Sequence, residues 1–508
     1  MRIFPAHSRF SGTSRLYILN YLGALLATLG IVMLLPLIPW WLYKDQLHYG
    51  TEASVFTYPA LSCIFFGLLA QRKIPFRVPT IEGAMVITAL GWLLCGVAGG
   101  IPFMTGLDKS FIDAFFEAVS GFTTTGITVF TGLDTMPRSI LFWRSLTQWL
   151  GGLGILTFFL AVSFRGGSAA AVLFSAEGHK ISTGRPVPGI AHTLSILWAI
   201  YTFFTLLSIL LFLVGGMNFF DALNHSFTCI STGGFSTHDE SIGYFAAHGY
   251  GGAVFIEYAT ILIMLAGGTN FLVHYRVLTG NIQSIFTDFE MKWYWGILAG
   301  SVVLICFDHF QRLHLPLPQL VGDFHNVFRS ALFQVASMLT STGYLTVDIN
   351  SSFFHAVSKQ LFMIIMVIGG CVGSTAGGIK VLRLAILARA FQAQLRRIRK
   401  PVRAVIPVVA AGKIIPDREL ERIASLFWIW LVLIGVGAVI TAVFSDLDSW
   451  QSFSGMASAM GNMGPFYFSV TKMASLHWLI KLTYIFAMLA GRLEIIPIAF
   501  LFAKISNR

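Results

Sequence analysis

The sequence predicts an all-α polytopic membrane protein, in which four parallel helix, pore-loop, helix repeats surround a pseudo-fourfold pore and an N-terminal two-helix hairpin lies outside the repeats. Three observations favour this fold class. The chain is 56% hydrophobic and only 11% charged, whereas soluble domains carry about 25% charged residues. Apolar runs of roughly 20 residues, the length that crosses a hydrocarbon core of ~30 Å, recur along the chain. A short glycine-containing motif recurs between these runs.

The apolar runs predict ten transmembrane spans, with both chain ends on one side. The first run follows Arg2, Arg9 and Arg15 and is too long for a removable signal peptide, so we expect it to be retained as a helix. The predicted spans are residues 16–43, 53–70, 81–104, 140–164, 190–214, 253–273, 293–310, 357–379, 423–444 and 476–502.

The distribution of basic residues indicates which span ends face the cytoplasm. The net charge of +11 does not indicate nucleic-acid binding, because basic residues of polytopic proteins collect in cytoplasmic loops. We therefore expect both termini in the cytoplasm and an acidic outer face that attracts cations. With the N-terminus inside, the cytoplasmic segments are 1–15, 71–80, 165–189, 274–292, 380–422 and the C-terminal tail, and the opposite side has few basic residues.

Four segments between the spans resemble one another. A hydroxyl side chain occurs six residues before the glycine on which each copy aligns. Thirteen residues before that glycine lie Asp113, Asp221, Ser330 and Gln451, and we interpret the first three as N-cap residues of a short helix. The aligned segments are residues 111–128, 219–236, 328–345 and 449–466, and the glycines are Gly126, Gly234, Gly343 and Gly464.

The order of spans and motifs divides the chain into repeats of one orientation. Each copy begins and ends on the cytoplasmic side, so the repeats are parallel about an axis along the membrane normal, unlike the inverted repeats of many secondary transporters. A glycine in the following span also belongs to each copy, at Gly151, Gly267, Gly369 and Gly491. The expected units are the hairpin 1–80 and repeats 81–175, 176–280, 281–400 and 401–508.

These repeats suit a pore for a monovalent cation. Irregular backbone at membrane depth must be buried in protein or line a watery cavity. Glycine permits a positive φ, so that carbonyl oxygens can turn toward a shared axis and replace the hydration shell of an ion. The C-terminal ends of four short helices would add partial negative charge there.

Seven motifs resemble the Trk/Ktr/HKT superfamily of potassium and sodium transporters, closest to the TrkH type of bacterial potassium-uptake subunit, over nearly the whole chain. They are TTTGIT (123–128), STGGFS (231–236), TSTGYL (340–345), GNMGPF (461–466), QWLGGLGI (148–155), GGCVGSTAGGIK (369–380) and GRLEIIPI (491–498). The resemblance implies a potassium filter at Thr124, Thr125, Gly126, Thr232, Gly233, Gly234, Ser341, Thr342, Gly343, Asn462, Met463 and Gly464. Serine replaces the first filter glycine in sodium-selective plant relatives, so Gly126 favours potassium.

Small residues interrupt the predicted span 357–379, which indicates an intramembrane loop. A kink filled by a neighbouring helix is the alternative, whereas the resemblance implies a gate below the filter. Arg492 occupies the position of Gly152, Gly268 and Gly370. It either places a charge in the permeation path or pairs with Glu494 or a loop carbonyl. The gating residues that we expect are Gly369, Gly370, Gly373, Ser374, Thr375, Ala376, Gly377, Gly378, Lys380 and Arg492.

The expected function is channel-like potassium uptake across a bacterial inner membrane. The alternative is a proton-coupled potassium symporter or a sodium-coupled one with sodium permeation. We find no side-chain cluster typical of an enzyme and no cofactor site, and potassium is the transported ion. The resemblance implies a homodimer and a cytosolic TrkA-type regulatory subunit that binds ATP, ADP or NAD and docks on segment 380–422. Without a partner, that segment would face lipid headgroups.

Overall fold

The computed structural model describes residues 16–43, 52–154, 157, 173, 190–313, 317–401, 406–495 and 497–498. Over these residues the chain is helical except for its loops and one antiparallel pair of short strands, β1 (Val409–Ala410) and β2 (Lys413–Ile414). The expected cytoplasmic segments 1–15 and 165–189, the C-terminal tail and the division between the first two repeats at residue 175 lie outside the described residues. The predicted all-α membrane fold is confirmed.

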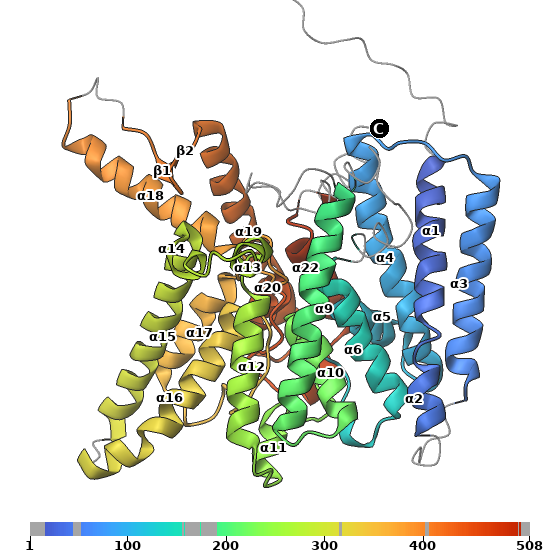
Figure 1. The fold of residues 1–508 in the computed structure, drawn as a ribbon, viewed down its shortest axis with the longest axis horizontal. Helices are drawn as coiled ribbons and strands as arrows, with labels where there is room; N and C mark the ends of the chain where they lie inside the picture. The colour runs from blue at the N-terminus through green and yellow to red at the C-terminus, as the bar shows by residue number, and fades with distance from the viewer. Residues whose placement is uncertain are drawn as a thin grey trace, which may run out of the picture.

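The N-terminal hairpin consists of α1 (Tyr17–Val32), α2 (Leu37–Leu42) and α3 (Ser54–Lys73). The first and third helices pack along their length at one edge of the molecule (Figure 1). Their backbones approach closely because Gly23 faces Gly67, where a Cβ atom would lie 2.8 Å from the opposite carbonyl oxygen. The other face of α3 exposes large apolar side chains, which suits contact with lipid.

Each of the four repeats has a long first helix, a pore helix that is short except in the third repeat, and a second helix. The first helices are α4 (Ile81–Gly106), α9 (Ile190–Val214), α15 (Phe289–Leu313) and α19 (Asp417–Val443). The pore helices are α5 (Phe111–Phe122), α10 (Phe219–Ile230), α16 (Leu317–Leu339) and α20 (Ser449–Gly461). The second helices are α6 (Arg138–Gly152), α12 (Ala253–Gly267), α17 (Ala356–Val367) and α22 (Trp478–Arg492).

The second helices are shorter than the sequence predicts. In the described part of the chain, six helices are long and apolar enough to cross a membrane, or seven if α12 and α13 (Phe271–Leu278), which bend by 103°, count as one span. The predicted spans 140–164, 253–273, 357–379 and 476–502 are therefore each interrupted, after Gly152, Gly267, Val367 and Arg492, and the number of ten spans stays a prediction. The ends of two of these helices pack closely on pore helices, because a Cβ atom at Gly151 or Gly491 would overlap the carbonyl oxygen of Phe122 or Met460.

The pore helices begin at residues other than those predicted. Ser110, Asn218 and Asp448 are the N-caps, and each accepts a hydrogen bond from the backbone N–H three residues later. Asp113, Asp221 and Gln451 are those later residues, and the pair of Asp448 and Gln451 forms a complete capping box. Ser330 lies inside α16, which extends further toward the N-terminus than its counterparts. The prediction that Asp113, Asp221 and Ser330 are N-caps is therefore wrong.

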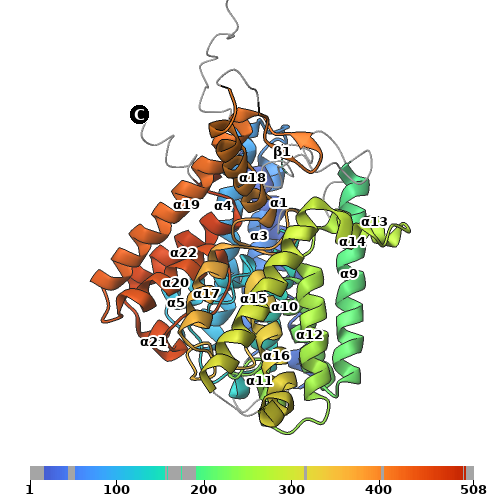
Figure 2. The ribbon, with the colours of Figure 1, turned by 90° about the vertical axis from the view of Figure 1, so that its left-hand side faces the viewer.

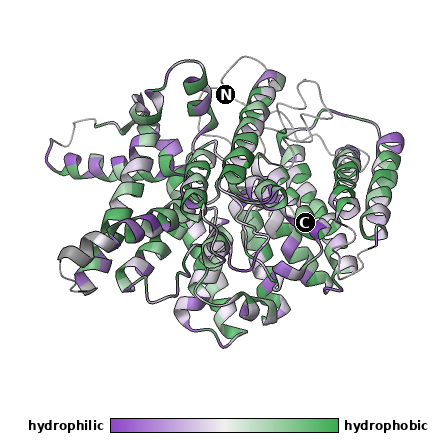
Figure 3. Ribbon diagram, turned by 60° about the horizontal axis from the view of Figure 1, so that its bottom comes forward, coloured by the Kyte–Doolittle hydropathy of each residue, from purple (hydrophilic) through white to green (hydrophobic). Residues whose placement is uncertain are grey.

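The two ends of the helical body differ in character. Figures 1 and 2 place α18 (Val381–Ile398) and the β1–β2 pair at one end, and α11 (Gly243–Ala247) at the other. The first of these ends carries the basic residues of segment 380–401. Hydrophobic residues cover most of the helices between the two ends (Figure 3). Shorter helices η3 (Leu133–Thr135), α14 (Ser284–Thr287) and α21 (Val470–Ser475) lie in the connections.

Candidate functional site

The four glycine-containing loops form one closed ring. Each aligned glycine faces the backbone carbonyl of the residue that precedes the glycine of the next repeat, and the fourth repeat closes on the first. An added Cβ atom would overlap that carbonyl oxygen in the first three repeats and would lie 3.3 Å from it in the fourth. The facing pairs are Gly126 and Gly233, Gly234 and Thr342, Gly343 and Met463, and Gly464 and Thr125.

The backbone of the ring repeats one conformation four times. The aligned glycines have φ between +76° and +104°, and the residues two positions earlier have φ between +51° and +54°. The residue between them does not have a positive φ. This alternation turns successive carbonyl groups toward the same side of the chain, as ion coordination by backbone oxygens requires. The earlier residues are Thr124, Thr232, Ser341 and Asn462.

Positive φ is strained for these four side chains, so surrounding contacts must hold it. In every repeat the backbone N–H one residue before the glycine donates to the carbonyl oxygen six residues before the glycine, at 2.8–3.0 Å. This hydrogen bond ties the loop to the end of its pore helix. The acceptors are Ser120, Thr228, Ser337 and Ser458, the four hydroxyl positions of the sequence repeat.

On one side, the ring borders a vestibule. A cavity of about 590 Å³ is lined by all four aligned glycines together with Arg144, His238, Asp239 and Asp348. Two residues of the predicted acidic outer face, Asp113 and Asp221, contact protein groups, because Lys481 lies 2.5 Å from the first and Thr237 donates to the second.

On the other side, residues 368–380 lie directly against the ring. The loop enters after α17 and leaves at α18, so the predicted interruption of the third repeat is confirmed. The backbone N–H of Gly377 donates to Ser341 Oγ at 2.6 Å, and the hydroxyls of Thr232 and Thr375 are 3.2 Å apart. Gly373 and Gly378 have positive φ, which permits the turns of the loop.

Hydrogen bonds to groups of repeats 2 and 3 hold this loop. Thr375 donates to the carbonyl oxygen of Gly267 at 2.9 Å, and the N–H of Cys371 donates to that of Gly268 at 2.9 Å. Glu290 accepts hydrogen bonds from backbone N–H groups at both ends of the loop, at 2.7 and 3.1 Å. Lys380 donates to the carbonyl oxygen of Ala376. The loop is therefore attached at several points.

Arg492 joins three repeats below the ring. Its guanidinium group donates to the carbonyl oxygens of Gly151 and Gly152 in repeat 1, at 2.5 and 2.6 Å, and to that of Thr375 in repeat 3 at 2.6 Å. Of the two predicted pairings, the loop carbonyl is therefore its partner. Glu494 instead pairs with Arg383 at 2.5 Å.

Sequence reasoning missed two groups that hold the ring. Gln148 donates to the carbonyl oxygen of Gly233 at 2.7 Å and accepts from the N–H of Phe235 at 3.0 Å. Glu117 and Arg144 form a buried ion pair beside the first loop, with 2.7 Å between the two groups. Polar and charged residues inside apolar segments are the signal that could have identified them.

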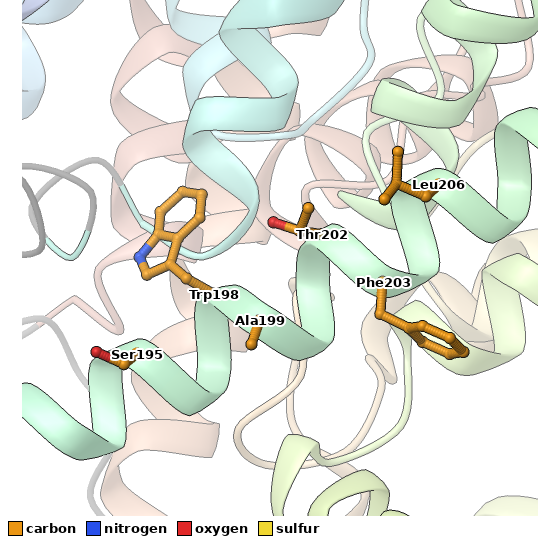
Figure 4. Close-up of a pocket in the computed structure, with 6 residues that line it drawn as sticks. All are labelled: Ser195, Trp198, Ala199, Thr202, Phe203 and Leu206. Carbon is orange, nitrogen blue, oxygen red and sulfur yellow. The ribbon is translucent and has the colours of Figure 1, made fainter.

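A second hollow, of about 630 Å³, lies on the outer face of α9. Its side chains project from a single helix without convergent polar groups (Figure 4), so we do not assign it a site. The residues that line it are Ser195, Trp198, Ala199, Thr202, Phe203 and Leu206.

Comparisons with known proteins bear on the whole chain. The family model of TrkH, a cation transport protein, matches residues 57–508. The chain is 31% identical over 497 residues to the Trk system potassium uptake protein TrkH of Escherichia coli K12, covering 96% of this chain and 98% of that protein. It is 31% identical over 502 residues to TrkG of the same organism, covering 97% and 98%. The crystal structure of the potassium transporter TrkH from Vibrio parahaemolyticus matches with a TM-score of 0.81 and 31% identity, over 96% of this chain and 98% of that one.

Proposed function

Because the chain belongs to the TrkH family of cation transport proteins, we propose that it takes up potassium ions through the pore at the centre of its four repeats. The observation that carries this proposal is the closed ring of Gly126, Gly234, Gly343 and Gly464 at the floor of one vestibule. The names of its relatives indicate potassium as the ion, and the ring indicates where the ion would pass.

We propose that the filter consists of the aligned glycines with the two residues before each of them. Four loops of one conformation offer rings of backbone oxygens, which replace the water that a potassium ion loses on entry. The pore helices end at these loops, so their partial negative charges favour a cation below the ring.

We propose that the gate is the loop 369–380 together with Arg492. The loop lies against the inner residues of two filter loops, and Arg492 adds a positive charge among repeats 1, 3 and 4. In this arrangement the pathway below the ring is closed. Conduction requires the loop and the arginine to move aside, and a regulatory partner would have to change the stability of their hydrogen bonds.

For partners and location we retain the expectations from the resemblance. We propose a homodimer in a bacterial inner membrane with both termini in the cytoplasm, and a cytosolic TrkA-type subunit that carries the nucleotide site. The basic helix α18, which leads directly out of the loop, supports a docking surface on segment 380–422. A partner bound there could act on the gate through one continuous helix.

The competing function is symport driven by protons or sodium. The parallel orientation of the repeats and the filter-like ring favour a channel-like permease. Rubidium and sodium uptake into proteoliposomes, measured with and without a pH gradient, tests both readings. Channel-like conduction predicts rubidium uptake that follows the membrane potential alone, whereas strict dependence on a proton or sodium gradient favours symport. Absence of rubidium uptake in every condition would contradict the proposal.

A further inference from the structure

Polar side chains stand behind the vestibule half of three filter loops. The position nine residues before the aligned glycine holds Glu117, His225 and Gln334 in repeats 1 to 3, and all three side chains are fully buried. The fourth repeat has Gly455 there. Because buried polar groups are costly unless they are hydrogen-bonded, their partners indicate what they hold in place.

Glu117 holds the segment that follows the first filter glycine. Its carboxylate accepts hydrogen bonds from Thr128 Oγ1 at 2.8 Å and from the backbone N–H of Val129 at 3.0 Å. Arg144 Nε donates to the same carboxylate at 2.8 Å. A glutamine at this position would not keep all three hydrogen bonds, because its amide accepts only at the oxygen and its nitrogen is a donor.

Arg144 extends this attachment to the second filter loop. It donates to the carbonyl oxygen of Ser236 at 3.1 Å, and its guanidinium carbon lies 4.0 Å from the centre of the Phe235 ring. The arginine is 1% exposed and its carboxylate partner is fully buried. A buried pair of this kind is strongly destabilised when one member loses its charge.

His225 holds Ser236 from the other side. Its Nδ1 lies 2.9 Å from the carbonyl oxygen of Asp221, so the ring proton is on Nδ1 and Nε2 is the acceptor in the neutral ring. Ser236 Oγ lies 3.0 Å from that Nε2, and the same oxygen accepts from the N–H of His238. One serine is therefore fixed at its carbonyl by Arg144 and at its hydroxyl by His225.

The other two repeats lack a charged attachment at this position. The amide atoms of Gln334 have no hydrogen-bond partner among the described residues. In the fourth repeat, Ser454 Oγ accepts from the N–H of Tyr467 at 3.0 Å, the residue that aligns with Val129. Among the described residues, the charged attachment of Glu117 and Arg144 thus reaches only the adjacent loops of repeats 1 and 2, whereas neutral bonds hold the third loop, such as that from Ser337 Oγ to the carbonyl oxygen of Tyr344 at 2.7 Å.

We propose that Glu117, Arg144 and His225 are positioning residues that hold the vestibule half of the first two filter loops apart and thereby determine the preference for potassium over sodium. The inference rests on the proposed function. Sodium is smaller than potassium, so carbonyl oxygens must move inward to coordinate it. A network that fixes loops 1 and 2 from behind opposes this contraction and therefore disfavours sodium.

The test is the ratio of rubidium to sodium uptake in proteoliposomes that contain Glu117→Gln. We expect the ratio to fall by about threefold to tenfold, since charge-assisted hydrogen bonds that hold the loops are lost. The matched control is Glu257→Gln, which makes the same change in the buried pair of Glu257 and Arg329, separated by 2.7 Å and without a filter contact in the described residues. The control should keep the ratio of the unmodified chain.

An unchanged ratio in Glu117→Gln, or an equal fall in Glu257→Gln, would overturn the inference. Ser236→Ala is a milder second variant, because it removes the hydroxyl bond of His225 without leaving a buried charge unpaired, and it should lower the ratio by about twofold. If Ser236→Ala keeps the ratio of the unmodified chain, His225 does not contribute to ion selection.

A second readout does not require transport. The midpoint of thermal unfolding of the purified chain should be higher in potassium chloride than in sodium chloride, because a bound ion stabilises the folded state. Glu117→Gln should narrow that difference and Glu257→Gln should not. Failure of rubidium uptake by the unmodified chain speaks against the proposed function, whereas an unnarrowed difference in Glu117→Gln contradicts the inference alone.

Discussion

The two faces of the filter ring are bordered by different kinds of groups. On the vestibule face the four aligned glycines border a cavity, and side chains such as Gln148 and Glu117 hold the loops from behind. On the opposite face a stretch of backbone, residues 368–380, lies against the ring, and Arg492 donates to the carbonyl oxygen of Thr375 in this stretch. One face is open and fixed by side chains, and the other is covered by a segment that could withdraw.

In the function that we propose, this difference separates two tasks. Ion selection depends on the spacing of oxygens in the ring, so it requires groups that do not move. Closure depends on a segment with an alternative position, and hydrogen bonds to backbone carbonyls can be exchanged for other partners at modest net cost. Substitutions on the vestibule face should therefore change which ion passes, and substitutions on the loop face should change how much passes.

The largest effect is expected at the ring itself. Gly234→Ala should reduce rubidium uptake by about tenfold or more, because alanine disfavours positive φ and its Cβ would overlap the carbonyl oxygen of Thr342. Gly464→Ala is the matched variant, because its Cβ atom would lie 3.3 Å from the facing carbonyl oxygen of Thr125. It should reduce rubidium uptake less than Gly234→Ala does. Equal losses would mean that the fourth loop is as tightly packed as the second.

The first glycine offers a substitution that changes the ion rather than the rate. Gly126→Ser should raise sodium uptake relative to rubidium by about threefold or more, because the side chain would meet the facing carbonyl of Gly233 and shift the oxygens of the ring. Parallel flux measurements with the two ions check this. An unchanged ratio would argue that Gly126 does not belong to the filter.

On the loop face, Arg492→Gln should raise basal rubidium uptake by about threefold to tenfold. The substitution removes a positive charge and weakens hydrogen bonds to Thr375, Gly151 and Gly152, which favours the open arrangement. The exposed Arg418 provides the control variant, Arg418→Gln. Uptake that stays at the level of the unmodified chain, with normal amounts of folded protein, would leave Arg492 with a structural role only.

Much of this arrangement follows from the sequence, and the exceptions have physical causes. The spacing of Gly126 and its counterparts predicts four equivalent loops, because local backbone requirements repeat with the motif. The early ends of the second helices in repeats 1, 2 and 4 and the caps at Ser110 and Asn218 were not predicted. Hydropathy does not register where one helix packs against the end of another, and Asp113 and Asp221 are acidic residues that suit a cap as well as the first turn of a helix.

The sequence also did not predict the partners of individual side chains. Arg492 had two predicted pairings within its own repeat or the loop, and the carbonyls of Gly151 and Gly152 were in neither. Such contacts join residues that are hundreds of positions apart, and they depend on the order of repeats around the axis. The single sequence contains no signal for that order, whereas the ring contacts determine it.

A smaller effect is expected from the hydroxyl that connects the loop with the filter. Thr375→Val keeps the shape of the side chain but removes its bonds to Gly267 and Thr232, so basal uptake should rise by about twofold to fivefold. Thr375→Ser should restore the value of the unmodified chain, because it retains the hydroxyl. If valine and serine behave alike, the hydroxyl does not contribute to closure.

The smallest expected effect is a pH dependence of stability on the vestibule face. Burial alone would lower the pKa of His238, but its hydrogen bonds to Asp221 and Asp134, together with their charges, raise it above 6.5. A raised pKa means that protonated His238 stabilises the fold fully below pH 6.5 and that this contribution is lost as the pH rises through the folded pKa.

The neighbours of this histidine shape the measurement. Tyr244 stacks on the His238 ring with ring centres 3.5 Å apart, and the His225 ring lies 6.4 Å away. The charge of Glu240 acts on Tyr244. The unfolding temperature of the purified chain should therefore decline by about 1–2 °C between pH 6.5 and pH 9, and His238→Gln should remove most of that decline. A slope that persists in His238→Gln would assign the pH dependence to another group. Rubidium uptake should change little between pH 6.5 and pH 9. In the hydrogen bonds of the described residues, none of these groups contacts Arg492 or residues 368–380.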